Sequence, residues 1–331
     1  MSCHIDVIAT SISGSIKDWS KVKQIIPLFD RYGEKDVSMY EVDSHHAARV
    51  KASELLMSGS RILISAGGSG TFNSVLEGCY DSGADLSELK LGFLRKGSAD
   101  LIGKTLGMPD EIEKAIEVFV HSIRNNTVVP CDVLLANSGV EGITARHFVG
   151  YGGAEIFGEI PYYTENRLTK YYKGVLGQLF GDKGPFFVGT NLAILARIPR
   201  CLTGKKTKWT IRVNGSEVAQ GHFQAMIFVN GDLGPDLPFA RSEPLGSGHF
   251  HLFAFRDIGF FALFNQLKHA FDASIMDDPE RWGFESFCIN ESLEIHPDHT
   301  DSFPINIDGS TMLCSNSARI EIAEQIQLLS V

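Results

Sequence analysis

The chain has 331 residues, of which 44% are hydrophobic and 21% are charged, and its formal net charge is −10. This length predicts two domains, and the composition is that of an ordinary globular protein whose core folds without disulfides. The acidic balance excludes the basic footprint of a nucleic-acid-binding protein and argues against attraction of the whole surface to an anionic membrane.

The N-terminus and the cysteines predict a cytoplasmic protein. The opening MSCHIDVIAT enters a strand-like pattern without the basic region and apolar stretch of a signal peptide, and no apolar run is long enough for a transmembrane segment. The six cysteines form no C-x-x-C pair, and none lies near a histidine at zinc-ligand spacing. Free thiols in a reducing compartment are therefore expected, and no residue is assigned as a metal ligand.

Residues 1–128 alternate short apolar runs with longer helical patterns, which predicts an α/β nucleotide-binding domain. The apolar run at 61–66 is typical of a parallel strand that is covered on both faces. The alternation predicts an open parallel sheet with right-handed crossovers. His45 and His46 precede a helix and are expected to cap it or to lie on its surface. The expected strands are 4–9, 37–41, 61–66 and 89–94, and the expected helices are 19–32, 45–58, 72–80 and 110–124.

Residues 129–331 have short alternating segments separated by turn signals such as Asn214-Gly215 and Asp308-Gly309. This pattern predicts a β-rich substrate domain with an antiparallel, sandwich-like or barrel-like sheet. The expected strands are 130–136, 145–150, 191–198, 209–213, 224–229, 249–255, 292–296 and 319–328, and the expected helices are 167–180 and 260–271.

A glycine-rich turn, Gly67-Gly68-Ser69-Gly70-Thr71, follows a buried strand and opens a helix. Glycines permit positive φ and let a ligand approach the backbone, and the N–H groups of such a turn and helix start favour an anion. The turn is neither a Walker loop nor a dinucleotide fingerprint, so by itself it is read equally well as a tight turn that binds nothing.

Two further loops favour the phosphate-binding interpretation. The segment LGFLRKGSADLIGKTLGMP at 91–109 is again strand, turn and helix, with Gly97 and Ser98 at the turn and Arg95 supplying positive charge. Thr10 follows the first strand. Ligands of open α/β sheets bind beyond the carboxyl ends of the strands, where all three loops are expected, so the sequence predicts a nucleotide-phosphate site there.

The ordered motifs resemble those of the diacylglycerol kinase and sphingosine kinase family of lipid kinases. GGSGTFNS at 67–74 is similar to the family's GGDGTxNE, TSISG at 10–14 to its NPxSG, and LGFLRKGSADLIGK at 91–104 to its LGxxPxGTxND. Asp132 matches a family aspartate, and INIDGST at 305–311 resembles a late DGE. The resemblance implies a nucleotide domain and a β-rich domain with the active site in the cleft between them. ATP would be the phosphoryl donor, and a hydroxyl of a lipid or lipid-like molecule the acceptor.

The resemblance also assigns roles to particular residues. Asp132 and Asp308 are the expected catalytic residues, with Asp132 as the general base that accepts the proton of the acceptor hydroxyl. A turn or sheet-end position without chemistry is the alternative for Asp132. The residues assigned to nucleotide binding are Thr10, Gly67, Gly68, Ser69, Gly70, Thr71, Asn73, Arg95, Gly97 and Ser98.

Almost every departure from the family pattern removes a carboxylate. Ser69, Ser74 and Ser310 stand where the family has an acid, and Gly246-Ser247-Gly248 replaces an acidic loop that holds a structural Mg²⁺ in some members. At 100–101, Asp-Leu replaces Asn-Asp. Mg²⁺ prefers charged oxygen ligands, so its recruitment should be weaker and its involvement stays open. Arg95, which stands in place of a family proline, is expected either to supply some of the missing positive charge together with Lys96 or to form with it a solvated basic pair.

Several alternatives therefore remain. The chain is either a kinase or a binding protein that keeps nucleotide or lipid binding on the same scaffold without phosphoryl transfer. A kinase for a soluble acceptor is a third interpretation, because nicotinamide-dinucleotide kinases share the GGDGT-type turn. No nucleic-acid partner is expected, whereas peripheral membrane contact through the Phe-rich segment 251–271 and a homodimer stay open.

Overall fold

The computed structural model describes residues 4–10, 22–95, 101–139, 145–165, 206–259, 262–299 and 302–330. The chain divides into two compact units. The first unit comprises Met1–Val133 with Glu324–Val331, and the second comprises Leu134–Ala323. Strand β5 (Val128–Asn137) leads from the first unit into the second, and strand β16 (Ala318–Leu329) leads back. The return of the last residues to the first unit was not predicted, because a strand pattern does not specify the sheet that the strand joins.

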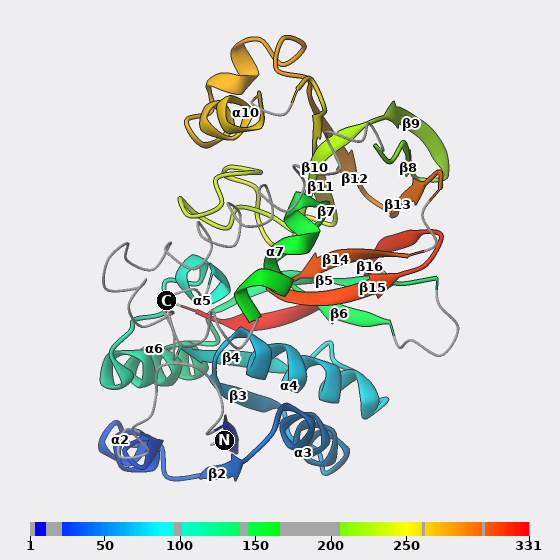
Figure 1. Ribbon diagram of the computed structural model, residues 1–331. Helices are drawn as coiled ribbons and strands as arrows, with labels where there is room; N and C mark the ends of the chain where they lie inside the picture. The colour runs from blue at the N-terminus through cyan, green and yellow to red at the C-terminus, as the bar shows by residue number, and fades with distance from the viewer. Residues whose placement is uncertain are drawn as a thin grey trace. The chain divides into compact units, whose positions relative to one another are not determined.

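The first unit is a parallel sheet with helices on its faces (Figure 1). Its strands follow the order β2-β1-β3-β4, and the last residues of β16 run parallel to β4. Every residue of β1 and β3 is buried, which explains their uninterrupted apolar sequences. The four strands are β1 (Ile5–Thr10), β2 (Val37–Val42), β3 (Ile62–Gly67) and β4 (Lys90–Arg95).

The helices of this unit form two groups. Helices α3 (His45–Met57) and α4 (Ser69–Asp81) pack closely against each other, and α2 (Ile25–Arg31) contacts α6 (Ile112–Asn125). The short α5 (Leu101–Thr105) follows β4. The close approach of α3 and α4 requires a glycine, because a Cβ at Gly78 would lie 2.1 Å from the backbone oxygen of Arg49.

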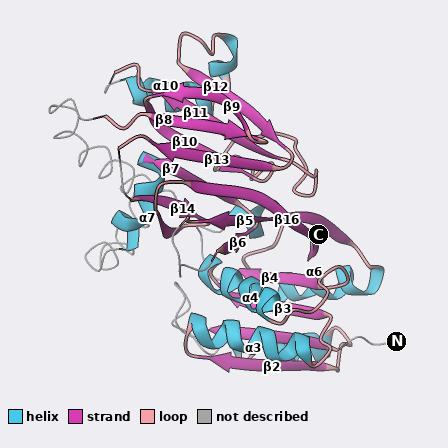
Figure 2. Cartoon of the chain, turned by 90° about the vertical axis from the view of Figure 1, so that its right-hand side faces the viewer, coloured by secondary structure: helices cyan, strands magenta, loops and turns pink. Residues whose placement is uncertain are grey.

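The second unit is built from antiparallel strands, as the alternation and turn signals predicted (Figure 2). One sheet has six strands in the order β12-β11-β10-β7-β14-β15, and the other contains β9-β8-β13-β16, with β5 pairing to β16 and β6. The strands are β6 (Arg146–Phe148), β7 (Tyr151–Glu155), β8 (Trp209–Val213), β9 (Ser216–Gly221), β10 (Phe223–Val229), β11 (Phe250–Arg256), β12 (Phe284–Ile289), β13 (Ser292–Pro297), β14 (Phe303–Ile307) and β15 (Ser310–Cys314).

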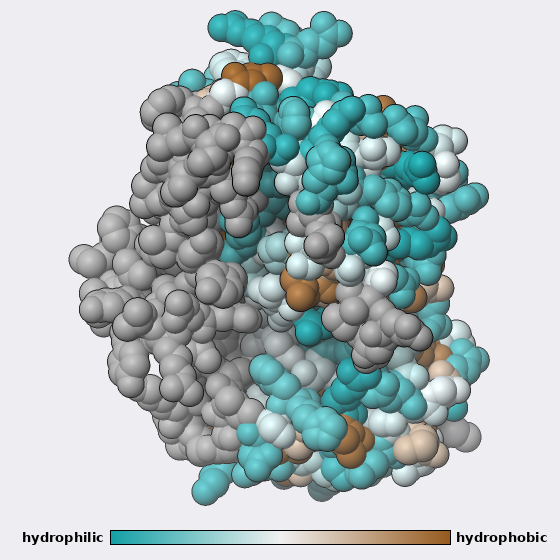
Figure 3. Space-filling view, turned by 45° about the vertical axis from the view of Figure 1, so that its right-hand side comes forward, coloured by the Kyte–Doolittle hydropathy of each residue, from teal (hydrophilic) through white to brown (hydrophobic). Residues whose placement is uncertain are grey.

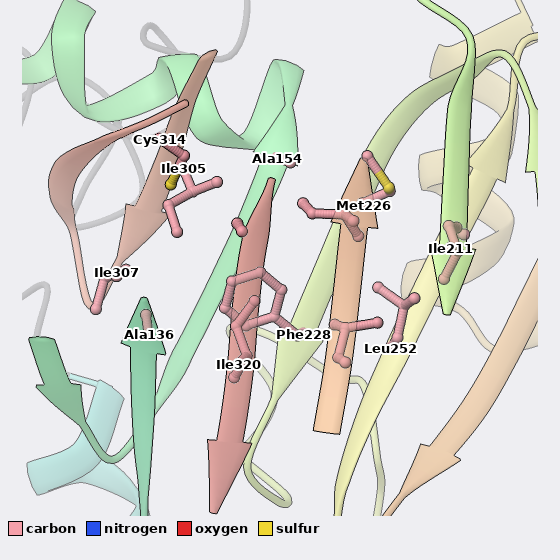
Figure 4. Close-up of a cluster of buried hydrophobic side chains, with 14 of the residues drawn as sticks. Ala136, Ala154, Ile211, Met226, Phe228, Leu252, Ile305, Ile307, Cys314 and Ile320 are labelled. Atoms are coloured by element: carbon pink, nitrogen blue, oxygen red, sulfur yellow. The ribbon is translucent and has the colours of Figure 1, made fainter. Parts of the chain in front are cut away.

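The core of the second unit lies between its two sheets (Figure 4). Phe228, Leu252 and Ile305 come from the six-stranded sheet, and Ile211 and Ile320 come from the other. All five are completely or almost completely buried. Helices α7 (Ile156–Glu165) and α10 (Ala262–Phe271) and the 3₁₀ turn η2 (Ser274–Asp277) complete the described part of the unit.

Two hairpin turns lie where the turn signals of the sequence predicted them. Asn214 and Gly215 join β8 to β9 with φ values of 51° and 79°, and Asp308 and Gly309 join β14 to β15 with φ values of 44° and 85°. Positive φ at both central residues is the signature of a type I′ turn, which matches the twist of the flanking strands. The predicted α/β plus antiparallel fold class is therefore confirmed.

Some strands escaped prediction for a physical reason. Strand β7 contains Gly152 and Gly153 in place of alternating large residues. A Cβ at Gly152 would lie 2.0 Å from the Phe228 ring, and one at Gly153 would lie 2.3 Å from the Met226 oxygen. Because close contact with β10 requires glycine at both positions, this segment lacks the alternating large residues that predict a strand. The expected helix 167–180 and strand 191–198 lie outside the described residues.

The described surface carries few large apolar side chains. On the face drawn in Figure 3, hydrophobic residues are scattered among hydrophilic ones. Ile258, Phe264, Phe271 and Met276 are exposed in and around α10. Among the described helices, none has the length and hydropathy required to cross a bilayer.

Candidate functional site

The strand order of the first unit places a switch point between β1 and β3. The chain moves from β1 outward to β2 in one direction and from β3 to β4 in the other. Ligands of open α/β sheets bind beyond the carboxyl ends of the strands at such a point. Thr10 is the last residue of β1 and Gly67 the last residue of β3, so these two predicted residues flank the switch point.

A hydroxyl pair joins the two sides of the switch point. The Oγ1 atoms of Thr10 and Thr71 lie 2.8 Å apart, and both side chains are buried. A Cβ at Gly67 would lie 2.3 Å from Oγ1 of Thr71, so only glycine leaves room for this pair. The structure therefore brings together three of the residues that the sequence assigned to phosphate binding.

Gly70 is required for a different close approach. A Cβ at this position would lie 2.9 Å from Cε1 of His45, the first residue of α3. The starts of α3 and α4 thus lie next to each other, with the exposed imidazole of His45 between them. His45 was expected only to cap α3 or to cover its surface, and in fact Ser44 makes the cap by accepting a hydrogen bond from the Ala47 N–H.

The expected reason for the glycines needs a correction. Positive φ was one predicted use, but neither Gly67 nor Gly70 has a positive φ, and Gly68 has a φ of −87°. The glycines are needed because Thr71 and His45 occupy the space of a side chain. They still leave the backbone open to a ligand, which is the second predicted use.

The start of α4 presents N–H groups of the kind that favour an anion. Gly68 is the N-cap, no side chain caps the helix, and the N–H groups of Thr71 and Phe72 both point to the Gly68 oxygen. The first N–H groups of a helix have no intrahelical acceptor, and the helix dipole favours a negative charge beside them. Ser69 is exposed at this end and Asn73 is half-buried.

Ser74, which replaces a family glutamate, is turned toward its own helix. Its Oγ donates a 2.8 Å hydrogen bond to the backbone oxygen of Gly70. A serine in a helix commonly bonds to the carbonyl one turn earlier. Among the described residues, no group of three or more metal-ligating side chains gathers at this edge of the sheet.

The loop after β4 is only partly described. In the parallel pairing of β3 and β4, Arg95 is the direct partner of Gly67, so its backbone lies beside the glycine turn. Gly97 and Ser98 lie outside the described residues.

Asp132 is buried in β5 within the first unit, with 2% of its surface exposed. Its Oδ1 accepts a 3.1 Å hydrogen bond from the side-chain amide of Gln325 on β16. The segment of β16 that returns to the first unit therefore holds this carboxylate, an arrangement that the sequence did not predict.

Asp308 occupies a separate place in the second unit, at the β14–β15 turn. Its two carboxylate oxygens accept hydrogen bonds from the N–H groups of Val149, Gly150 and Tyr151, at 3.2, 3.3 and 2.8 Å. Its own N–H donates to the Tyr151 oxygen at 2.8 Å. The side chain thereby satisfies three donors of the β6–β7 connection, which would otherwise be buried without acceptors.

The pKa of Asp308 reflects two opposing effects. Burial raises the pKa of its carboxyl from 3.8 to about 6, because the charged form loses its hydration. The three backbone N–H groups favour the charged form and limit the rise. Asp308 thus titrates much closer to neutral pH than an exposed aspartate, while its oxygens are already used in the turn.

The first unit is thus a parallel sheet with a glycine turn at its switch point, and the second is antiparallel. Comparison with known proteins shows what this chain resembles. Residues 4–133 match the diacylglycerol kinase catalytic domain. A diacylglycerol kinase of Staphylococcus carnosus (strain TM300) is 25% identical over 138 residues, which are 41% of this chain and 40% of that relative.

Solved structures show the same fold over nearly the whole chain. A diacylglycerol kinase from Bacillus anthracis str. Sterne has a TM-score of 0.66 at 17% identity, covering 99% of this chain and 97% of the other. An NAD kinase from Archaeoglobus fulgidus, solved in complex with ATP, has a TM-score of 0.50 at 12% identity, covering 98% of this chain and 93% of the other. Residues 4–133 therefore match the diacylglycerol kinase catalytic domain, and the predicted resemblance is confirmed. The match to the curated relative spans well under half of that relative's length.

Proposed function

We propose that the protein is a nucleotide-dependent phosphotransferase that moves the γ-phosphoryl group of ATP to a hydroxyl of a lipid or lipid-like acceptor. The observation that carries the proposal is the glycine turn at the switch point. It combines an uncapped helix start, an exposed Ser69 and a Thr10–Thr71 pair that fixes its shape. The catalytic domain family of residues 4–133 supports ATP as the donor.

The polyphosphate would lie against the N–H groups of Ser69 and Gly70. These amides carry the positive end of the α4 dipole. His45 adds a ring N–H beside Gly70, and Arg95, the last residue of the adjacent strand β4, pairs with Gly67. These cationic and N–H groups would replace part of the charge neutralisation that carboxylate-bound Mg²⁺ supplies to other phosphoryl-transfer enzymes, so we propose a weak dependence on Mg²⁺.

An apolar cavity in the second unit supports a lipid-like acceptor. It is lined entirely by hydrophobic side chains from α7, β10, α10 and the loop before β11, among them Phe157, Ile160, Ile227, Phe239 and Leu263. An acyl chain would bury its apolar surface against this lining, whose side chains must move apart to admit it because the open space is about 30 Å³. The Phe-rich segment 251–271 contributes to this cavity, and its exposed Phe264 is suited to peripheral contact with a membrane.

Asp132 is the proposed general base. It matches the family aspartate, it is buried in β5, and its Oδ1 accepts a hydrogen bond from Gln325, which holds the carboxylate in place. Asp308 is proposed to act indirectly, by holding the β6–β7 connection, because its two oxygens accept three backbone hydrogen bonds.

The test is a transfer assay on the full chain. Radiolabelled ATP, with and without Mg²⁺, is incubated with mixed micelles containing diacylglycerol, a sphingoid base or ceramide, and in parallel with NAD. Label transferred to a lipid acceptor supports the proposal, and Asp132→Asn should reduce the rate by about a hundredfold or more. Label found only on NAD would contradict the lipid assignment, and no transfer to any acceptor at high enzyme concentration would contradict catalysis.

A second candidate is a binding protein on the same scaffold. It is favoured by Ser74, whose hydroxyl bonds to its own helix at a position where the resembled family carries an acid. Restoring Ser69→Asp and Ser310→Glu separates the two candidates. Transfer that appears only after restoration would establish the binding protein, whereas transfer by the unmodified chain rules it out.

A further inference from the structure

Three side chains of the kinds that bind transition metals meet on one face of the six-stranded sheet in the second unit. His249 immediately precedes β11, His251 follows two residues later, and Cys288 on β12 is the direct cross-strand partner of His251. Candidate ligand atoms of the three residues all lie within 4.8 Å of one another. The sequence did not reveal this group, because Cys288 is distant from both histidines along the chain.

The strand geometry explains why these side chains share a face. Alternate residues of a strand point to opposite sides, and Phe250 and Leu252 point into the core between the sheets. His249 and His251 therefore point outward. The ring of Phe253, the next residue on that face, stacks beside His251 with centroids 6.1 Å apart and gives the histidine an apolar neighbour.

Glu243 adds a carboxylate to the group. Its Oε1 lies 2.8 Å from Nε2 of His249, and its Oε2 lies 4.0 Å from Nε2 of His251. The backbone of Glu243 is fixed, because its oxygen accepts a 2.8 Å hydrogen bond from the Asp232 N–H and its N–H donates to Ala240. The carboxylate is therefore held at the cluster by an anchored loop.

His251 has a buried nitrogen that no hydrogen bond satisfies. Its Nε2 is shielded from solvent and has no partner within bonding distance. A buried polar atom without a partner is costly and calls for an explanation.

His249 is oriented in the way that metal-bound histidines usually are. Its Nδ1 lies 3.2 Å from the backbone oxygen of Ser247, which can only accept, so Nδ1 carries the hydrogen. The other nitrogen, Nε2, then faces Glu243. A ring N–H bonded to a backbone carbonyl fixes the tautomer and direction of a ligating histidine.

We propose that Glu243, His249, His251 and Cys288 form a binding site for one zinc-type divalent transition-metal ion. The four donors are two imidazole nitrogens, one thiolate and one carboxylate, a set that suits tetrahedral zinc better than Mg²⁺. Zinc lies about 2.0–2.1 Å from nitrogen and about 2.3 Å from sulfur, so side-chain rotations would draw the two histidines and the cysteine around the ion and bring Glu243 to it from His249. The metal ion would be the partner of Nε2 of His251, which has no hydrogen bond in the metal-free chain.

Binding is a ligand exchange with a proton balance. The proton of the Cys288 thiol and the proton between Nε2 of His249 and Oε1 of Glu243 are released to solvent as the zinc–sulfur and zinc–nitrogen bonds form, and the ion loses bound water to the four protein ligands. Cys288 is exposed, so the ion has a path from solvent. The site would tie the Glu243 loop to β11 and β12, a role independent of the nucleotide site in the first unit.

The experiment uses the full chain, reduced and freed of metal with a chelator. Titration with Co²⁺ as the spectroscopic probe should give one ion per chain, with tetrahedral visible bands and a thiolate-to-cobalt charge-transfer band. Zn²⁺ should then displace the Co²⁺. Removing an indirect support of a metal site already costs 10- to 100-fold in affinity, so Cys288→Ser should weaken binding by about 100-fold or more and abolish the charge-transfer band.

A matched control comes from another histidine–glutamate pair in the same unit. Nε2 of His296 lies 3.3 Å from Oε2 of Glu294 on β13, and no cysteine belongs to a metal-ligating group there among the described residues. His296→Gln should leave Co²⁺ affinity unchanged. Circular dichroism on each variant checks folding, which should be retained in Cys288→Ser because the side chain is exposed.

Two results would overturn the proposal. The first is equal Co²⁺ affinity of the unmodified chain and Cys288→Ser. The second is an X-ray absorption spectrum of the zinc-loaded, unmodified chain that contains no sulfur scatterer, which would show an adventitious ion held by surface oxygen and nitrogen atoms. Neither result depends on phosphoryl transfer, so the proposal stands or falls separately from the proposed function.

Discussion

The glycine turn of the first unit and the Asp308 turn of the second match two motifs of the same family, but they differ in which part of the motif is kept and in whether it is exposed. At the glycine turn the backbone shape is kept, Ser69 is exposed and the helix start is uncapped. At the Asp308 turn the carboxylate is kept, but it is buried and accepts three backbone hydrogen bonds. The first turn is therefore open to a ligand, and the second is closed upon itself.

This difference distinguishes the motif residues that the fold requires from those that only a reaction would require. Gly67, Thr71 and Asp308 match the family pattern, and each is required by a contact inside its own unit. Ser69 and Ser74 depart from the pattern, and neither side chain supports another element of the fold. A motif match in this chain is stronger evidence for the fold than for catalysis, because contacts within the fold already require the matching residues.

The largest loss of stability is expected from substitutions at the closed turn, the turn that contains Asp308. Asp308→Ala removes the acceptor of three buried N–H groups and places alanine at a φ of 44°, so the free energy of unfolding should fall by about 3 kcal/mol or more. Asp308→Asn keeps an oxygen and tolerates positive φ, so its loss should be about half as large. Urea unfolding of both variants measures the difference. Equal stability of Asp308→Ala and the unmodified chain would contradict the closed-turn interpretation.

The raised pKa of Asp308 predicts a pH dependence of the same turn. Between about pH 4 and about pH 6 the folded carboxyl holds a proton that the unfolded chain has released, so stability falls as the pH rises through this window. The fall amounts to about 3 kcal/mol, at 1.36 kcal/mol per unit of pKa. Subtracting the unfolding free energy of Asp308→Asn at each pH isolates it. A difference that stays constant from pH 4 to pH 6 would show that burial does not raise this pKa.

A smaller loss of stability is expected at the open turn. Gly67→Ala places a Cβ 2.3 Å from Thr71 Oγ1, and relieving this overlap should cost about 1–3 kcal/mol. Ser69→Ala, two residues away and exposed, is the matched control and should change stability by less than about 0.5 kcal/mol. Thermal unfolding of the pair measures both. If the two variants were equally stable, the Thr10–Thr71 pair would not be what requires glycine.

The smallest effect tests whether the open turn receives help from α3. His45→Ala should weaken ATP binding by about 2- to 10-fold, the value of one hydrogen bond, without changing stability. His46→Ala removes the neighbouring exposed histidine and should change nothing. Calorimetric titration with ATP measures both. Equal losses in the two variants would indicate a general charge effect, and no loss in either would remove His45 from the proposed site.

Much of the fold could be predicted from the sequence, because its elements have strong local signals. Apolar runs predicted β1 and β3, and the pairs Asn214-Gly215 and Asp308-Gly309 predicted the turns that they form. Strand β7 could not be predicted, because its glycines are required by contacts with β10 that only the folded chain makes.

The candidate site was predictable to a similar extent and for a similar reason. The glycine turn is continuous in sequence, so its position at the carboxyl end of β3 followed directly. The contacts of Gly70 with His45, of Asp132 with Gln325 and of Asp308 with the β6–β7 connection join distant segments. No local pattern records such contacts, and the cluster around Cys288 was missed for the same reason.

The most direct measurement of the central claim is ATP binding to Gly70→Ala. The added Cβ would lie 2.9 Å from the far end of the flexible His45 side chain, so it fits with a small movement, and alanine favours the helix by up to about 1 kcal/mol over glycine. The methyl group would nevertheless cover the turn where phosphates are proposed to bind. We predict that calorimetry will show at least about tenfold weaker ATP binding while the melting temperature is unchanged or higher. Undiminished ATP affinity in this variant would contradict a phosphate site on the glycine turn.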